Sequence, residues 1–365
     1  MMCEIAQSNN YLLLNFKYKK NNNKPVFDPA RERAIVKRIT EGMDEEASSW
    51  FSMLYNTIFE ISRARQTKML LTDTSLADSI IEAKNKTAEY FPANAKVVCQ
   101  GVEGAYSQRA CEKLFRRPDI TYADTFKDAF EKVASGECRY GVVPIENSIH
   151  GSVTDVYDLL KEYKNRIHIV RTVRIPIHHV LLAKKGTSLE NIKEVYSHSQ
   201  AIGQCSEFFR NNPSINVNVS KNTAMAAKMV SESERRDIAA ISSYDCAELY
   251  GLDIISRDLQ NSDNNHTRFI CISNEFEIYP GSSKIGIMFT VPHRTGSLSS
   301  ILSRFTAIGV NLTKLESRPI KGRDFEFMLY AEIESFGFTD ELMTYLCELN
   351  SRPEEFVFLG SYTEV

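Results

Sequence analysis

The chain has 365 residues, enough for two or three domains with buried cores. Its 44 basic residues nearly balance its 47 acidic residues, and the net charge of −3 argues against a nucleic-acid-binding protein. No apolar run reaches the length of a membrane-spanning helix. The start, Met1-Met2-Cys3-Glu4, lacks the basic segment and apolar core of a signal peptide, so we expect a cytoplasmic location.

The eight cysteines are scattered along the chain. They form no closely spaced pair, and no histidine accompanies them at the spacing of metal ligands. In a reducing compartment most of them would be small buried apolar residues. We therefore expect no metal.

Residues 1–71 are predicted to be helical. Asp28-Pro29 is a typical helix start, and Gly42 ends that first helix. A longer second helix carries Trp50, Leu54, Ile58, Ile61 and Met69 on one face. Two short helices cannot bury such a face alone, so we expect a homodimer or a larger homo-oligomer. Residues 72–95 are polar and are predicted to be a linker with room for one helix.

Strands and helices alternate from residue 96 to 275, which predicts parallel or mixed α/β sheets. The pattern forms two groups with a strand that returns to the first group, which indicates two lobes with a cleft between them. The expected strands are 96–100, 140–143, 168–173, 175–182, 194–197, 237–241 and 268–272.

The segment from Gly141 to Val153 carries the strongest local signal. An apolar run from Tyr140 to Val143 predicts a buried strand, and Pro144 is expected to end it. Short polar side chains follow before the next helical pattern. Polar groups at the carboxyl end of a strand are typical of a ligand site in an α/β protein, although a simple helix cap would explain them equally well.

Five polar clusters lie at strand ends or helix starts in this region. Helix N-termini and neighbouring hydroxyl groups bind anions such as carboxylates, so the set favours a cleft for a small anionic molecule. No nucleophile–base pair, Walker-type phosphate loop or GxGxxG motif is present. We therefore expect no cofactor, and a hydroxyl or carboxyl group that acts as a general acid on a bound anion. The clusters are 101–107, 146–152, 197–200, 222–223 and 266–268.

Residues 284–364 are predicted to form a separate unit. The order strand, helix, strand, strand, helix, strand is the ferredoxin-like pattern. Lys321-Gly322-Arg323 is expected to form its central hairpin turn.

Several of these segments together resemble a known family, prephenate dehydratase. The matching segments are Gly141–Ser148, Tyr196–Gln200, Gln204-Cys205 and Thr267-Arg268-Phe269. The C-terminal unit resembles the regulatory ACT domain that follows the dehydratase, and residues 18–32 resemble the chorismate mutase domain of the bifunctional P-proteins. The resemblance implies three parts: an all-α mutase-like unit, a two-lobed α/β dehydratase of the periplasmic-binding-protein type, and a ferredoxin-like ACT domain.

The resemblance also implies the dehydratase chemistry, in which prephenate loses CO2 and water to give phenylpyruvate. Thr267 would be the catalytic residue, because it would donate or relay a hydrogen bond to the departing hydroxyl group. The substrate would be bound by Asn147, Ser148, Ser199, Gln200 and Arg268.

In the ACT-like unit the resemblance implies that L-phenylalanine binds as an effector at a dimer interface. The implied residues are Gly296, Ser297 and Leu298 with Glu316, Ser317, Arg318 and Pro319. A plain ferredoxin-like interaction module would have the same pattern of elements.

In the mutase-like unit, the residues that match a site for chorismate are Lys19, Asp28, Arg31, Glu32, Ser62 and Gln66. The family has two further arginines on a helix that precedes this segment, whereas no arginine precedes Tyr18 in this chain. We therefore expect either a shortened domain or one that serves only in dimerisation, with weak or absent mutase activity.

A non-catalytic reading of the sequence stays open. A two-lobed binding protein with an ACT module could sense an amino acid without chemistry, and the N-terminal helices could be a scaffold. The motif at Thr267 and the absence of a signal peptide argue against that reading.

Overall fold

The computed structural model describes residues 28–70, 73–262, 264–320, 322–323 and 326–365. Lys19 of the predicted mutase site and Lys321 of the predicted hairpin turn lie outside these residues. Within the described part of the chain, no helix combines the length and the apolar character that crossing a bilayer would need.

In the part of the N-terminal helical unit that the structure describes there are two helices, α2 (Pro29–Thr40) and α3 (Glu45–Leu70). Asp28 begins α2 by accepting a hydrogen bond from the Arg31 backbone N–H at 3.0 Å, and Gly42 turns the chain with a φ of +83°. The apolar face of α3 is exposed, with Trp50 at 63% of its full accessibility. Helix α3 packs against α13 of the C-terminal unit.

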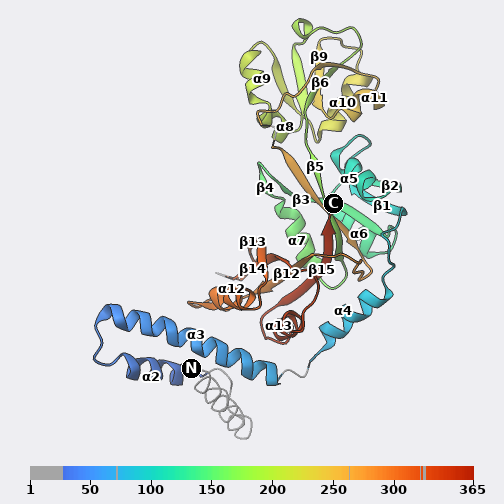
Figure 1. Ribbon diagram of the computed structural model, residues 1–365. Helices are drawn as coiled ribbons and strands as arrows, with labels where there is room; N and C mark the ends of the chain where they lie inside the picture. Colours follow the sequence, from blue (N-terminus) through green and yellow to red (C-terminus); the bar gives the residue numbers. More distant parts are fainter. Residues whose placement is uncertain (1–27, 71–72, 263, 321, 324–325) are drawn as a thin grey trace.

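The first lobe is a mixed sheet with helices on both faces (Figure 1). Helix α5 packs on one face around Cys99 and Val142, and α6 and α7 pack on the other around Val98 and Val143. The strands are β1 (Asn94–Gln100), β2 (Arg117–Ala123), β3 (Tyr140–Asn147), β5 (His168–Pro176) and β11 (His266–Ser273), with β4 (Gly151–Ser152) beside β3. The helices are α5 (Tyr106–Leu114), α6 (Phe126–Ala134) and α7 (Thr154–Glu162).

The second lobe has its own five-stranded sheet, in the order β10-β6-β9-β7-β8. The chain enters it after β5 and leaves it before β11, so two neighbouring strands of the first lobe connect to it. Its strands are β6 (Val180–Ala183), β7 (Glu194–Ser197), β8 (Asn216–Val219), β9 (Ile238–Ser242) and β10 (Asp253–Ser256). Its helices are η1 (Leu189–Asn191), α8 (Ser199–Gln204), α9 (Ser206–Asn211), α10 (Thr223–Glu232) and α11 (Asp245–Leu249).

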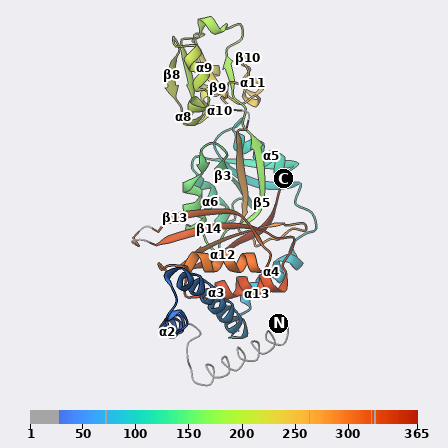
Figure 2. The same ribbon diagram turned by 60° about the vertical axis from the view of Figure 1, so that its left-hand side comes forward.

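The C-terminal unit has the predicted β-α-β-β-α-β order and the sheet order β13-β14-β12-β15. Helices α12 and α13 cover one face of its sheet and lie between that sheet and α3 in Figure 2. The other face packs on α7 and the first lobe through Met288, Met328 and Tyr330. The elements are β12 (Lys284–Thr290), α12 (Ser297–Ala307), β13 (Asn311–Pro319), β14 (Phe327–Glu334), α13 (Asp340–Asn350) and β15 (Phe356–Glu364).

The C-terminal unit is joined to the first lobe by strand pairing. Thr363 and Glu364 of β15 pair in parallel with Arg171 and Thr172 of β5, so both sheets form one sheet of ten strands. In addition, α4 (Ser75–Lys86) from the predicted linker packs on α13 and buries Ile80 in the core of the C-terminal unit. The linker therefore contributes to that core.

Strand β3 is longer than expected, and the expectation that Pro144 ends it is wrong. The strand continues to Asn147, and Pro144 lies opposite Phe269 at a bulge in the pairing with β11. The extra residue of this bulge is Ile145 on β3, which has no partner on β11, and the irregular ladder beside Pro144 accommodates the missing N–H of proline. Strand β2 and helix α6 were also absent from the predicted elements.

We predict that Gly360→Ala weakens the junction between the C-terminal unit and the first lobe. Gly360 has a φ of +147°, and a Cβ there would lie 2.1 Å from the Ile169 carbonyl oxygen on β5. The added methyl group would meet backbone atoms of β5, which cannot move aside as a side chain can. Urea unfolding should therefore show a free energy of unfolding that is about 1–3 kcal/mol lower than that of the wild type. Gly337→Ala is the matched control, because φ is +117° there and open space surrounds the added methyl group. Equal losses in both variants would contradict the prediction.

Candidate functional site

Asn147 and Thr267 form a pair at the carboxyl end of β3 and the start of β11, where they are cross-strand partners. The Asn147 side-chain oxygen accepts hydrogen bonds from the backbone N–H groups of Ile149 and His150, both at 3.0 Å. Its Nδ2 group therefore points at Thr267 and donates to Oγ1 at 3.0 Å. Since Thr267 accepts in this bond, the hydrogen of its own hydroxyl group can be donated to a bound molecule.

Ser148 ties the turn after β3 to the start of β11. Its hydroxyl group donates to the Asn264 carbonyl at 2.7 Å and accepts from the His266 N–H at 2.9 Å. The Ser148 side chain is thus already engaged within the protein, and its contribution is to hold the turn in place.

A chain of buried polar side chains connects Asn147 to the second lobe. Asn147 Nδ2 also donates to Asn265 Oδ1 at 2.9 Å, and Asn265 donates to Gln204 Oε1 at 2.8 Å. The same Gln204 oxygen lies 2.8 Å from His179 Nε2, so this ring nitrogen carries the hydrogen. Asn265 and His179 are 1% and 2% exposed, and burial lowers the pKa of His179. The polypeptide passes from the first lobe to the second at His179 and returns at Asn265.

Ser199 and Gln200 lie at the start of α8 in the second lobe, and both are exposed. His198 precedes them as the helix cap, and its Nδ1 accepts from the Gln200 N–H at 3.4 Å. Burial and the nearby His150 lower the pKa of His198. The start of α8 therefore lies near the turn that follows Asn147, although neither Ser199 nor Gln200 hydrogen-bonds to the Asn147–Thr267 pair among the described residues.

Arg268 does not accompany Thr267 into this site, contrary to the expectation that it binds substrate. Adjacent residues on a strand face opposite ways, and the guanidinium group of Arg268 forms ion pairs with Glu332 and Glu364 of the C-terminal unit. Burial alone would raise the pKa of Glu332, but the charges of Arg268 and Lys284 lower it, so the carboxylate stays ionised.

The residues predicted for a mutase site lie on facing parts of α2 and α3. Glu32 forms an ion pair with Arg63 at 2.5 Å, and Gln66 Nε2 donates to the Ser62 hydroxyl group at 2.9 Å. Gln66 is buried, and its side-chain oxygen has no hydrogen-bond partner within the described residues. Asp28 is occupied as the cap of α2, and Arg31 is exposed. Sequence reasoning missed Arg63.

The residues predicted to bind phenylalanine fall into two groups. Gly296 has a φ of +84° and precedes α12, whose first residue, Ser297, has a buried hydroxyl group without a hydrogen-bond partner among the described residues. Leu298 packs into the core under α12 and α13. Glu316 and Arg318 face the first lobe, while Ser317 and Pro319 are exposed on the edge strand β13.

Glu316 and Arg318 each contact the first lobe. Glu316 Oε2 accepts a hydrogen bond from the Ser152 hydroxyl group at 2.8 Å, and Arg318 Nε lies 3.6 Å from Asp158 Oδ1 on α7.

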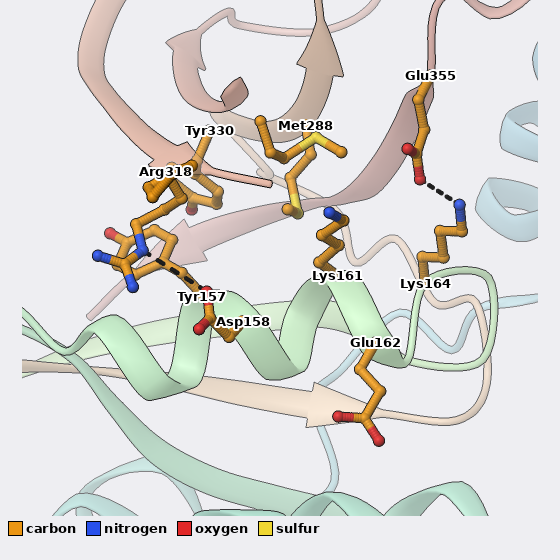
Figure 3. A pocket seen from close by; sticks show the side chains of 11 residues that line it. Tyr157, Asp158, Lys161, Glu162, Lys164, Met288, Arg318, Tyr330 and Glu355 are labelled. Carbon is orange, nitrogen blue, oxygen red and sulfur yellow. Dashed lines mark hydrogen bonds and ion pairs between the residues drawn. The ribbon is translucent and has the colours of Figure 1, made fainter. Parts of the chain in front are cut away.

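A cavity of about 320 Å³ lies between α7 and the sheet of the C-terminal unit. In Figure 3, Arg318 reaches Asp158 on one side, Lys164 meets Glu355 on the other, and Lys161 extends from α7 between them. The apolar part of the lining consists of Tyr157, Met288, Pro319, Met328 and Tyr330. The cavity does not include Asn147 or Thr267, so it is separate from the candidate dehydratase site.

Comparison with known proteins covers most of the chain. Residues 97–277 match the family model for prephenate dehydratase. The arogenate dehydratase/prephenate dehydratase 2 of Arabidopsis thaliana is 32% identical over 313 residues, which is 82% of this chain and 81% of that protein. The bifunctional chorismate mutase/prephenate dehydratase of Enterobacter agglomerans is 29% identical over 347 residues, which is 93% of this chain and 86% of that protein.

A solved structure is similar in fold over most of this chain. The prephenate dehydratase of Arthrobacter aurescens, solved in complex with L-Phe, superposes with a TM-score of 0.67 at 27% identity. The superposition covers 73% of this chain and 89% of that one. The match of residues 97–277 includes both Asn147 and Thr267, and the chain belongs to the prephenate dehydratase family.

Proposed function

We propose that this chain converts prephenate to phenylpyruvate, CO2 and water at the Asn147–Thr267 pair. The bond between the ring and its carboxylate group breaks, and the electron pair enters the ring as CO2 leaves. The ring carbon then releases its hydroxyl group, which departs as water once it has a proton. The ring becomes aromatic, so one well-placed hydrogen-bond donor at the departing oxygen is the main demand on the protein.

The geometry of the pair is the observation that carries this proposal. Asn147 is fixed by two backbone N–H groups and donates to Thr267, which leaves the threonine hydrogen free for the departing hydroxyl group. A donor held before the substrate arrives needs no reorganisation during the reaction. This arrangement favours catalysis over the alternative of a binding protein that does no chemistry.

We infer that the second lobe supplies contacts to the substrate carboxylates through Ser199 and Gln200. Both residues are exposed and lie near the turn that follows Asn147. Closure of the lobes would bring them onto a substrate bound at Thr267. No binding role is proposed for Arg268, since its guanidinium group is held by Glu332 and Glu364.

Arogenate is the second candidate substrate, because the Arabidopsis relative is named for both reactions. It differs from prephenate in having an amino group in place of the keto oxygen, and the ring chemistry is the same. Turnover of the two compounds, followed side by side as phenylpyruvate and phenylalanine formation, separates the candidates. No product from either would overturn the proposed function.

We predict that Thr267→Val and Thr267→Ala lower dehydratase kcat by about 10²–10⁴-fold, the usual contribution of one acid–base group. Valine keeps the shape of threonine and replaces the hydroxyl group with a methyl group, which cannot donate a hydrogen bond. Thr267→Ser should recover part of the rate because serine can still donate. Steady-state kinetics measures kcat for the three variants, and thermal unfolding checks that each variant is folded. A valine variant with wild-type kcat would contradict the role of Thr267.

We further propose that the C-terminal unit is an ACT domain that binds L-phenylalanine and regulates the dehydratase. Its ferredoxin-like order supports this, as does the phenylalanine complex of the Arthrobacter aurescens protein. The Ser297 hydroxyl group, which has no hydrogen-bond partner among the described residues, lies at the start of α12, where backbone N–H groups can bind a carboxylate. A second copy of this chain would complete the site along the edge strand β13 and cover the apolar face of α3.

We predict that Ser297→Trp abolishes phenylalanine binding to the full chain. The indole ring would fill the space beside Gly296, whereas Ser299→Trp places the same ring at an exposed position of the same helix and should leave binding intact. Calorimetry measures binding, and dehydratase assays with phenylalanine measure the coupling, which is typically 5–150-fold in affinity. Unchanged binding in Ser297→Trp would remove the proposed site.

We propose that chorismate is a poor substrate of the N-terminal helical unit. Its transition state is a dianion that needs cations, and the carboxylate of Glu32 already occupies Arg63. The polar groups of Ser62 and Gln66 remain available to the ether oxygen, so a low rate is expected.

We predict that kcat/KM for chorismate is about 10²–10⁴-fold below that for prephenate, because Arg63 is paired with Glu32 and a charge-assisted contact withheld from the substrate costs a few kcal/mol. The rate of chorismate turnover by the full chain is measured as the decrease in chorismate absorbance, under the same conditions as the dehydratase assay. Gln66→Ala should lower the chorismate rate further and leave the dehydratase unchanged. Comparable rates on both substrates would refute the prediction.

A further inference from the structure

Two rows of cross-strand partners lie side by side on β3 and β11. Asn147 pairs with Thr267, and in the next row Glu146 pairs with Arg268. The hydrogen bond between Asn147 and Thr267 places both side chains on one face, from which Asn147 also reaches Asn265 and, through it, Gln204 of the second lobe. Since the side-chain period of a strand is two residues, Glu146 and Arg268 point from the opposite face, toward the C-terminal unit.

Arg268 is held there by a buried cluster of charges. Its guanidinium group pairs with Glu332 and, through Nε at 2.7 Å, with Glu364. Lys284 lies 3.2 Å from Glu332 and 3.3 Å from Glu364, and Arg174 Nε lies 2.7 Å from Glu364, so the two acidic groups are paired with three basic groups. Tyr362 also donates a hydrogen bond to Glu332 at 3.0 Å. Buried charges satisfied in this way hold their positions closely, because each alternative arrangement leaves a charge unpaired.

Glu146 is held by a different strand of the C-terminal unit, β13. Lys314 on β13 donates to Glu146 Oε2 at 2.7 Å and to the Ser152 hydroxyl group at 3.3 Å. Only 14% of the Lys314 side chain is exposed, and its ammonium group also lies over the Tyr157 ring. The turn that carries Asn147 is therefore fixed to β13 at both ends, through Glu146 and through Ser152.

We propose that Glu146 and Arg268 are positioning residues through which the C-terminal unit sets the geometry of the Asn147–Thr267 pair. The inference rests on the dehydratase function proposed above. Each is one residue from a member of the pair on a continuous strand, so a shift of its charged group moves the neighbouring side chain on the opposite face of the strand. The C-terminal unit thereby reaches the site without contacting substrate.

The first test compares two lysines that both join the C-terminal unit to the first lobe. Lys314→Met removes the partner of Glu146 and keeps the apolar stem. Lys164→Met removes the ion pair with Glu355 at the far end of α7, away from both site strands. A small misplacement of a catalytic group can cost about 10²-fold in rate. We expect Lys314→Met to lower kcat about 10-fold or more with little change in KM, and Lys164→Met to leave kcat unchanged.

Conservative and compensating variants distinguish positioning from general stability. Lys314→Arg should retain most of the rate, and the exchanged pair Glu146→Lys with Lys314→Glu should recover activity lost in either single variant. Arg268→Lys keeps the charge but cannot bridge two carboxylates as the planar guanidinium group does, so kcat should fall while the fold is retained. Equal effects of Lys314→Met and Lys164→Met on kcat would overturn the proposal.

A measurement that needs no turnover separates this inference from the function itself. Amide hydrogen exchange, followed by mass spectrometry, should speed up in residues 146–153 and 266–268 in Lys314→Met and remain at the wild-type rate in Lys164→Met. If the wild-type chain converts neither prephenate nor arogenate, the proposed function fails, yet exchange still reports whether Lys314 holds these segments. Unchanged exchange in Lys314→Met would exclude the positioning role.

Discussion

The short parallel ladder between β5 and β15 is the constraint on which the rest of the molecule depends. It makes one sheet from two units that the sequence separates, and it brings the charged side chains of β13, β14 and β15 against the back of the site strands. Because paired strands keep a spacing of about 4.8 Å, the relative position of the two units is set by backbone hydrogen bonds as well as by side-chain packing. The bare backbone of Gly360 allows this approach.

The charge cluster around Arg268 adds specificity to that junction rather than a large stabilisation. Removing charges from water is costly, and the attraction between them repays the cost only when every group has a partner. Here Arg268, Lys284, Glu332 and Glu364 satisfy one another, with Tyr362 as an additional donor. An apolar contact of the same area would tolerate sliding between the units, whereas these ion pairs hold a single register.

The order of elements in the C-terminal unit, the two lobes and the position of residues 146–152 at the end of an apolar strand could all be predicted from the sequence. Each rests on local patterns, either an alternation of elements or polar residues after an apolar strand. The direction of Arg268 could also have been foreseen, because a strand residue next to Thr267 has to face the other way. Its partners could not, since Glu332 and Glu364 are more than 60 residues away and no local pattern reports them.

Other features were beyond sequence reasoning for related reasons. Pro144 within β3 lies beside a bulge at Ile145, and that irregularity is defined only by the pairing of β3 with β11, a strand from a distant part of the chain. Helix α4 was expected to lie in a linker because its few apolar residues show no clear period, yet Ile80 finds a core on α13. Asn265 and His179 had no motif of their own, and their role follows from meeting Gln204 where the lobes join.

The insertion of the second lobe between β5 and β11 has a consequence for synthesis on the ribosome. Strands β6 to β10 are contiguous in sequence and can form their own sheet as soon as residue 256 has emerged. The first lobe has to wait, because β11 fills the gap between β3 and β5, and the edge of β5 is covered only when the final residues of the chain arrive. Open strand edges invite pairing with other chains. During synthesis the chain should therefore pass through a partly folded species with a formed second-lobe sheet and an open first sheet.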